Sequence, residues 1–178
     1  MVLHLLILSG EEEDFVRELV IDGDSTFLDL HNAIQKSVKF DSGQLASFFV
    51  SDDEWSKNEE ITLMQMDEDE AVLLMGQVKI SEYIDSVKDK LIYTFDYFSN
   101  RGFFVEVLDV AEDKNLEVAT VVRAEGVVPL QIELDDPFEF QEEEIFDFDE
   151  EDDIMSGYGD DEFDEFDGFN EFNDFDEY

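Results

Sequence analysis

Apolar and polar residues alternate along several short segments of the chain, and this pattern predicts β-strands. Val2–Ser9 is almost wholly apolar and ends at a Ser-Gly turn signal, whereas Phe15–Ile21 alternates up to an Asp-Gly-Asp turn. Two neighbouring strands joined by a short connection predict a hairpin. Further strands are expected in Leu45–Val50, Glu60–Met64, Leu91–Phe98, Phe103–Val110 and Val118–Val122. Ala71–Met75 and Val127–Leu134 are additional strand candidates that are not counted in the expected order of elements.

One long helix is predicted after Thr26, because apolar residues follow it at helical spacing as far as Val38. Thr26 suits the N-cap position, and Asp29 places an acid in the first turn. A second, shorter helix is predicted for Ser81–Val87. The expected order is therefore β-β-α-β-β-α-β-β-β, with Ser99–Gly102 as the turn of the clearest hairpin. Strands outnumber helices, which favours an α+β fold with a mixed, mainly antiparallel sheet.

Residues 135–178 contain twenty-two Asp or Glu residues, eleven Phe or Tyr residues, and no Lys, Arg or His. Neighbouring carboxylates lie within the screening length of about 8 Å at physiological salt, so such a segment cannot collapse into a core. The sequence therefore predicts a folded domain over residues 1–134 and a disordered acidic-aromatic tail over residues 135–178.

Six aromatic residues of the tail recur at every third position: Phe163, Phe166, Phe169, Phe172, Phe175 and Tyr178. A three-residue period does not keep side chains on one face of an α-helix, which has about 3.6 residues per turn. Three interpretations remain open: a solubilising tail without a partner, a motif that docks its aromatic residues on a basic partner protein, and an inhibitory plug that folds back on the domain.

Residues 1–134 are acidic as well, with twenty-nine acids against ten scattered bases and a net charge of −19. Direct binding of nucleic acid is not expected, because it requires clustered Lys or Arg. Anionic membrane surfaces are disfavoured for the same reason, and no apolar run is long enough to predict a membrane span. The chain has no cysteine, and its apolar N-terminal run lacks the basic residues of a signal peptide. A cytoplasmic location is therefore expected.

The helix segment Asp29–Gln35 reads DLHNAIQ, with Phe15–Glu18 before it and Leu45–Phe49 after it. In this order, together with Tyr93–Tyr97, which reads YTFDY, these segments resemble the plasmid pRiA-type ORF-three-like family, whose members are often labelled as insertion-element passenger TnpR proteins. The resemblance covers about residues 1–130. Versions from Bacteroidales-type bacteria are similar also in the segments Asp52–Trp55 and Glu60–Leu63 and in their acidic tails.

The resemblance implies a fold but no established activity. It marks motif positions of unknown role at Arg17, Asp29, His31, Gln35, Trp55 and Asp96. The TnpR label implies a recombinase, which the acidic charge argues against. The chain also departs from many members in residues 97–102 and 127–129, where they carry a Gly-Asp and Trp segment and a Cys-Pro-Pro-type segment.

No catalytic motif, cofactor-binding motif or metal-ligand spacing occurs in the sequence. The predicted function is therefore a non-enzymatic protein-interaction module without a cofactor, whose tail contacts a basic protein partner or folds back on the domain. The alternative is a hydrolase or metal-dependent enzyme built around His31 with Asp52, Asp53 and Asp96. A core histidine and a solvated acidic loop explain the same residues more simply, because metal sites need several convergent ligands.

Overall fold

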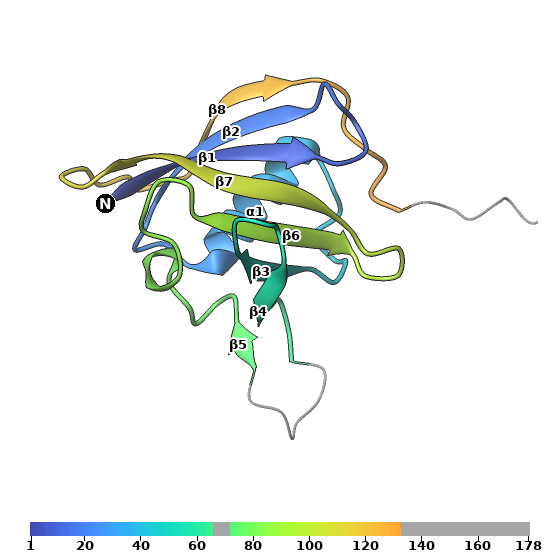
Figure 1. Cartoon of the computed structure of the whole chain (residues 1–178), viewed down its shortest axis with the longest axis horizontal. Helices are drawn as coiled ribbons and strands as arrows, with labels where there is room; N and C mark the ends of the chain where they lie inside the picture. The colour runs from blue at the N-terminus through green and yellow to red at the C-terminus, as the bar shows by residue number, and fades with distance from the viewer. Residues whose placement is uncertain (66–71, 133–178) are drawn as a thin grey trace, which may run out of the picture. The chain divides into compact units, whose positions relative to one another are not determined.

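The computed structural model describes residues 1–65 and 72–132 of the chain, and Figure 1 shows the arrangement of their elements. The strands are β1 (Val2–Ser9), β2 (Val16–Asp22), β3 (Ser47–Ser51), β4 (Lys57–Thr62), β5 (Leu73–Leu74), β6 (Lys90–Asp96), β7 (Arg101–Ala111) and β8 (Thr120–Glu125). The helical elements are α1 (Phe27–Val38) and the 3₁₀ turn η1 (Ile80–Glu82). The predicted α+β fold class is confirmed.

The strands form a single eight-stranded sheet in the order β5-β4-β3-β6-β7-β1-β2-β8. Neighbouring strands run antiparallel except for the short parallel pair of β4 and β5. The mixed, mainly antiparallel sheet expected from the sequence is thus correct. In this order β8 lies at one end of the sheet, beside β2, and can be followed as the outermost strand in Figure 1.

The predicted β1–β2 hairpin is present, and its alternating residues supply the centre of the core. Leu5 lies opposite Leu19, and Leu3 lies opposite Ile21. All four side chains are fully buried. Since successive side chains of a strand point to opposite faces, this alternation directs one row of apolar residues to the core. Each fully buried aliphatic side chain stabilises the fold by about 1.5–3 kcal/mol.

Helix α1 packs on the core face of the sheet and begins and ends where its sequence signals predict. The Thr26 hydroxyl accepts a hydrogen bond from the Asp29 amide at 3.2 Å, and the Asp29 carboxylate accepts one from the Thr26 amide at 2.9 Å. Lys39 ends the helix in the left-handed conformation with φ of 58°. The apolar face packs against the sheet through Phe27, Leu30, Ile34 and Val38.

The hairpin of β6 and β7 is also present, but its turn comprises residues 97–100, because β7 already begins at Arg101. The prediction of Ser99–Gly102 as the turn was therefore displaced by two residues. Asn100 supplies the left-handed conformation of the turn, with φ of 53°. A Cβ atom at Gly102 would lie 2.6 Å from the carbonyl oxygen of Tyr93, so the close approach of the two strands requires glycine there.

Two predicted elements are wrong within the described residues. The expected helix Ser81–Val87 is only the η1 turn, because the Asp89 carboxylate accepts hydrogen bonds from the amides of Asp85 and Ser86, which a helix would pair with the carbonyls of Ser81 and Glu82. No strand forms over residues 127–132, where Pro129 has no amide proton for a strand ladder. This segment is held instead by side chains, since Arg101 donates to the Leu130 carbonyl at 2.7 Å.

Other strands differ in their ends: β3, β4, β5 and β8 begin or finish two or more residues away from the predicted bounds. The described residues belong to one unit, Met1–Pro137. The second unit, Phe138–Tyr178, lies outside the described residues, so the predicted tail and its boundary at residue 134 stay predictions. Within residues 1–65 and 72–132, no helix has the length and apolar character needed to cross a bilayer.

Candidate functional site

Three polar residues of the two sequence motifs meet in the interior, between α1 and β6. The amide nitrogen Nε2 of Gln35 lies 2.5 Å from the Tyr93 hydroxyl, and the same hydroxyl lies 2.8 Å from Nδ1 of His31. His31, Gln35 and Tyr93 are at most 4% exposed. We call these three residues the buried polar cluster.

The donors and acceptors fix the protonation state of this cluster. The Gln35 amide donates to the Tyr93 oxygen, so the single hydroxyl proton of Tyr93 is directed to His31 Nδ1. Burial lowers the pKa of His31 and raises that of Tyr93, although the hydrogen bond from Gln35 acts in the opposite direction on the tyrosine. Both groups are therefore neutral at neutral pH, with the His31 proton on Nε2.

The buried polar cluster is closed off by aromatic rings. Phe48 packs on Tyr93 with its ring centroid 4.7 Å away, and Phe103 stacks on the same tyrosine at 6.4 Å. On the surface of the described residues lie hollows of about 370, 450 and 150 Å³, and none of them is lined by a residue of the cluster. The cluster therefore joins helix and sheet inside the core.

Arg17 holds the last strand of the sheet against β2. Its guanidinium donates to the carbonyl oxygens of Val16 at 2.8 Å and Glu125 at 2.5 Å, and it lies 4.5 Å from the ring centroid of Phe15. Burial lowers its pKa. Hydrogen bonds to carbonyls and a cation–π contact explain why a 5%-exposed arginine is tolerated at this position. The geometry assigns Arg17 a structural role.

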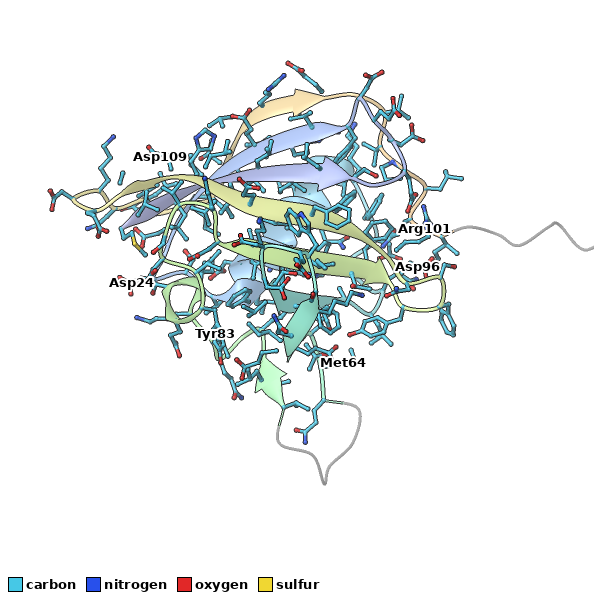
Figure 2. The ribbon with its side chains drawn as sticks, viewed as in Figure 1. Asp24, Met64, Tyr83, Asp96, Arg101 and Asp109 are labelled. Carbon is cyan, nitrogen blue, oxygen red and sulfur yellow. The ribbon has the colours of Figure 1, made fainter. Side chains whose placement is uncertain are left out.

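Asp96 belongs to an ionic clamp at the β6–β7 turn, and Figure 2 shows it beside Arg101. Its carboxylate accepts hydrogen bonds from the amides of Phe98 at 3.0 Å and Ser99 at 3.2 Å. Arg101 lies 3.6 Å from this carboxylate and donates twice to Glu11, at 2.8 and 2.6 Å. The clamp ties the β6–β7 turn to the β1–β2 loop.

Trp55 and the acids before it form a turn on the opposite face of the sheet from α1. Asp52 accepts hydrogen bonds from the amides of Ser56 and Glu54 at 2.9 and 3.0 Å, and these bonds lower its pKa. Trp55 adopts a φ of 62° and packs edge-on against Phe104 at 4.9 Å. This loop is thus fixed by backbone hydrogen bonds and aromatic packing.

The structure does not bring together the residues of the enzymatic alternative. Asp53 forms an ion pair with Lys90, the first residue of β6, whereas Asp96 is the last residue of that strand. Six residues of extended strand correspond to about 20 Å. His31 is enclosed in the core between them, and among residues 1–65 and 72–132 no group of three or more His, Asp or Glu side chains is placed to hold a metal ion.

Comparison with protein families gives a match over most of the chain. The model of the plasmid pRiA4b ORF-3-like protein family matches residues 2–167. The chain belongs to this family. No curated protein matches the chain.

Among solved structures, the plasmid pRiA4b ORF-3-like chain is similar to a protein of unknown function from Methanosarcina mazei Go1. The TM-score is 0.54 at 20% sequence identity, over 69% of this chain and 68% of the other. This likeness supports the fold alone, and neither comparison supplies an activity. The family match extends beyond residue 134 and includes Phe163 and Phe166. All six aromatic residues of the proposed tail contact lie outside the described residues.

The surface of this family member carries one feature that the sequence did not indicate, a groove between α1 and β8. Two adjoining hollows, with volumes of about 370 and 450 Å³, share Ala33, Lys36 and Ala119 in their lining. We call this surface the α1–β8 groove, and its remaining lining residues are Ser25, Asp29, Asn32, Ser37, Glu117, Val118, Thr120 and Val121. Its two walls are separated by about eighty residues in the sequence, so no local motif could have marked it.

A smaller hollow of about 150 Å³ lies beside the ionic clamp, between the β6–β7 turn and Ile132. Phe98 is fully exposed at its rim, whereas Tyr97 is held by hydrogen bonds of its hydroxyl with Ser47 and Glu60. Burial and the Glu60 hydrogen bond raise the pKa of Tyr97 to about 12. Sequence reasoning also missed Tyr93 and Arg101 as central residues, although Tyr93 stands in the YTFDY segment.

Proposed function

We propose that this protein is a non-enzymatic, cytoplasmic interaction module whose segment 135–178 contacts a basic protein partner. The proposal rests on the composition of that segment, which has twenty-two acids, eleven aromatic residues and no base. Charge attracts a cationic surface over a distance, while aromatic side chains provide apolar contact area once the two surfaces meet. The absence of cysteine from the chain fits a reducing compartment.

The Lys and Arg side chains of residues 1–134 favour an external partner over a contact of the acidic segment with its own domain. Most of them are already engaged: Lys79, Lys90, Arg101 and Arg123 pair with acids, Arg17 with backbone carbonyls, and Lys57 with Asn100 and Thr94. Among the described residues, Lys36, Lys39, Lys88 and Lys114 form no ion pair. Four dispersed lysines are a weak internal counterpart for a charge of −22.

The test separates charge from aromatic character in the full-length chain. In one variant, the six aromatic residues at positions 163, 166, 169, 172, 175 and 178 are replaced by alanine, which leaves the charge unchanged. In a second, six acids are replaced by their amides and the aromatic residues are kept: Asp160, Asp161, Glu162, Asp164, Glu165 and Asp167. Proteins recovered from a lysate of the source organism are quantified by mass spectrometry for each variant and for the unaltered chain.

We expect a basic partner that is lost with both variants and that binds less at high salt, because screening weakens the attraction between charges. Immobilised poly-lysine serves as the control for unspecific attraction, and it should lose binding only with the amide variant. Equal recovery of every protein by all three chains would refute the proposal. Loss with the amide variant alone would reduce it to unspecific polyanion binding.

A further inference from the structure

The outermost strand β8 has an open edge. It pairs with β2 along one side, and within residues 1–65 and 72–132 no strand pairs with its other side. All six of its residues are exposed, including Val121 at 40% and Val122 at 52%. The free amides and carbonyls of such an edge can bind an added strand.

The α1–β8 groove gives this edge a place for side chains. A strand added beside β8 directs every second side chain towards α1. On that side, Ala33 and Ala119 leave space, and Val118 and Val121 provide exposed apolar walls. Each hollow is large enough for a side chain of the size of valine or leucine. The groove therefore suits an extended segment with alternating apolar residues.

The charges of the groove and of the whole chain indicate which kind of segment binds in the groove. Asp29 and Glu117 both line one hollow of the groove, and the chain as a whole carries a charge of −41. A second copy of the chain would bring another −41, and the two would repel. A cationic segment gains attraction both from the whole chain and from these two carboxylates. Because successive side chains alternate between the two faces, a cation must occupy the groove-facing position nearest Asp29 and Glu117, away from the Lys36 ammonium, while apolar residues occupy the groove-facing positions beside Val121.

We propose that β8 and the α1–β8 groove bind an extended, basic segment of a partner protein by strand addition, with apolar side chains seated against α1 beside Val121 and a basic side chain at the Asp29 and Glu117 end. The contact involves no residue of the acidic segment 135–178. Its basic character rests on Asp29, Glu117 and the charge of −19 on residues 1–134, and its geometry rests on the edge strand and groove. It can therefore fail or succeed independently of the proposed function.

The probe is an acetylated and amidated lysine–valine hexapeptide, Val-Lys-Val-Lys-Lys-Lys, whose first, third and fifth side chains lie on one face of a strand. It is titrated into the full-length, isotope-labelled protein. Amide chemical shifts report where it binds. We expect shifts at β8 (Thr120–Glu125) and along the helix wall from Asp29 to Lys36. The same hexapeptide with glutamate at every lysine position is the control for charge. A lysine–valine peptide with every backbone nitrogen methylated is the control for strand pairing, because it cannot donate to the edge.

Two matched variants test the groove itself. Glu117→Lys reverses a charge in the groove, whereas Glu112→Lys makes the same change in the same loop outside it. We expect Glu117→Lys to weaken binding of the lysine–valine peptide by about fivefold and Glu112→Lys by less than about twofold, since an exposed charge pair contributes up to about 1 kcal/mol. The variant with six alanines in residues 163–178 should bind the peptide like the unaltered chain.

Four results would overturn the inference. Shifts confined to other strands would place the contact elsewhere, and equal binding of the fully methylated peptide would exclude strand addition. A doubled mass in light scattering before peptide is added, together with no change of the β8 amide signals on titration, would make a second copy the occupant. Equal effects of Glu117→Lys and Glu112→Lys would show that only the total charge matters.

Discussion

The two faces of helix α1 differ in what they present to the rest of the molecule. The face towards the sheet carries His31 and Gln35, which meet Tyr93 in a buried cluster enclosed by aromatic rings. The opposite face contributes Ala33 and Lys36 to an open groove beside the edge strand β8. Two conspicuous residues of the helix motif, His31 and Gln35, thus lie inside, whereas a third, Asp29, caps the helix and lines the groove.

This difference shows that a distinctive motif need not mark a reactive site. A polar group in a core must be hydrogen-bonded, so each of His31, Gln35 and Tyr93 constrains the identity of the others. Residues that line an open groove are under no such mutual constraint. In this family member, the motif can therefore be explained by packing, while binding chemistry is better sought where α1 faces the groove.

The largest expected effect comes from removing the centre of the buried polar cluster. Tyr93→Ala deletes a fully buried ring and leaves both His31 and Gln35 without their shared partner. We expect the free energy of unfolding to fall by about 4 kcal/mol, as for other buried aromatic residues replaced by alanine. Denaturant unfolding followed by circular dichroism measures the change.

Tyr93→Phe is the matched control, because it keeps the ring and removes only the hydroxyl. It leaves a buried acceptor on His31 and a buried donor on Gln35 unpaired, which should cost about 1–3 kcal/mol. A loss of stability below about 0.5 kcal/mol would mean that the hydrogen bonds of Tyr93 do not stabilise the core. That result would contradict the role assigned to the cluster.

A smaller effect is expected from pH, because only one group of the cluster titrates near neutrality. Burial lowers the pKa of His31 in the folded state, so below about pH 6.5 the unfolded chain takes up a proton that the folded chain does not. The free energy of unfolding should therefore be at its full value above that pH and decrease as the pH falls. Unfolding curves at intervals between about pH 7 and pH 5 measure this decrease.

His31→Gln provides the comparison for the pH series. The variant cannot titrate at this position, and it keeps His4 and all acids of the unaltered chain. Its stability should depend less on pH over the same interval. Parallel pH profiles of the two proteins would show that His31 takes up its proton equally well in the folded state, and the cluster would then not be closed.

The strand and helix patterns could be predicted wherever local packing decides the structure. The alternation of Phe15–Ile21 predicts the core row that includes Leu19 and Ile21, and Thr26 with Asp29 predicts the start of α1. The helix expected at Ser81–Val87 failed because the Asp89 carboxylate took the amides of Asp85 and Ser86, which would have continued it. Asp89 lies beyond the predicted segment, so the segment itself carries no signal of this competition.

The candidate site was only partly accessible from the sequence for the same reason. The motif positions were found, but that Tyr93 joins His31 and Gln35 depends on the register of β6 against β3 and β7. The α1–β8 groove depends on a chain path that brings residues 117–121 back beside α1. Neither Ala33 nor Ala119 differs from an ordinary surface residue until that path is known.

The smallest effect on stability is expected from a substitution in the α1–β8 groove. Val121→Thr, on β8, should change the free energy of unfolding by less than about 0.5 kcal/mol, because the new hydroxyl remains accessible to water. Val107→Thr makes the same change at a 1%-exposed position of β7 and should cost about 1–3 kcal/mol, since the hydroxyl is then buried without a designed partner. A large loss at Val121 would mean that the groove is packed like the interior, and the distinction between the two faces of α1 would no longer hold.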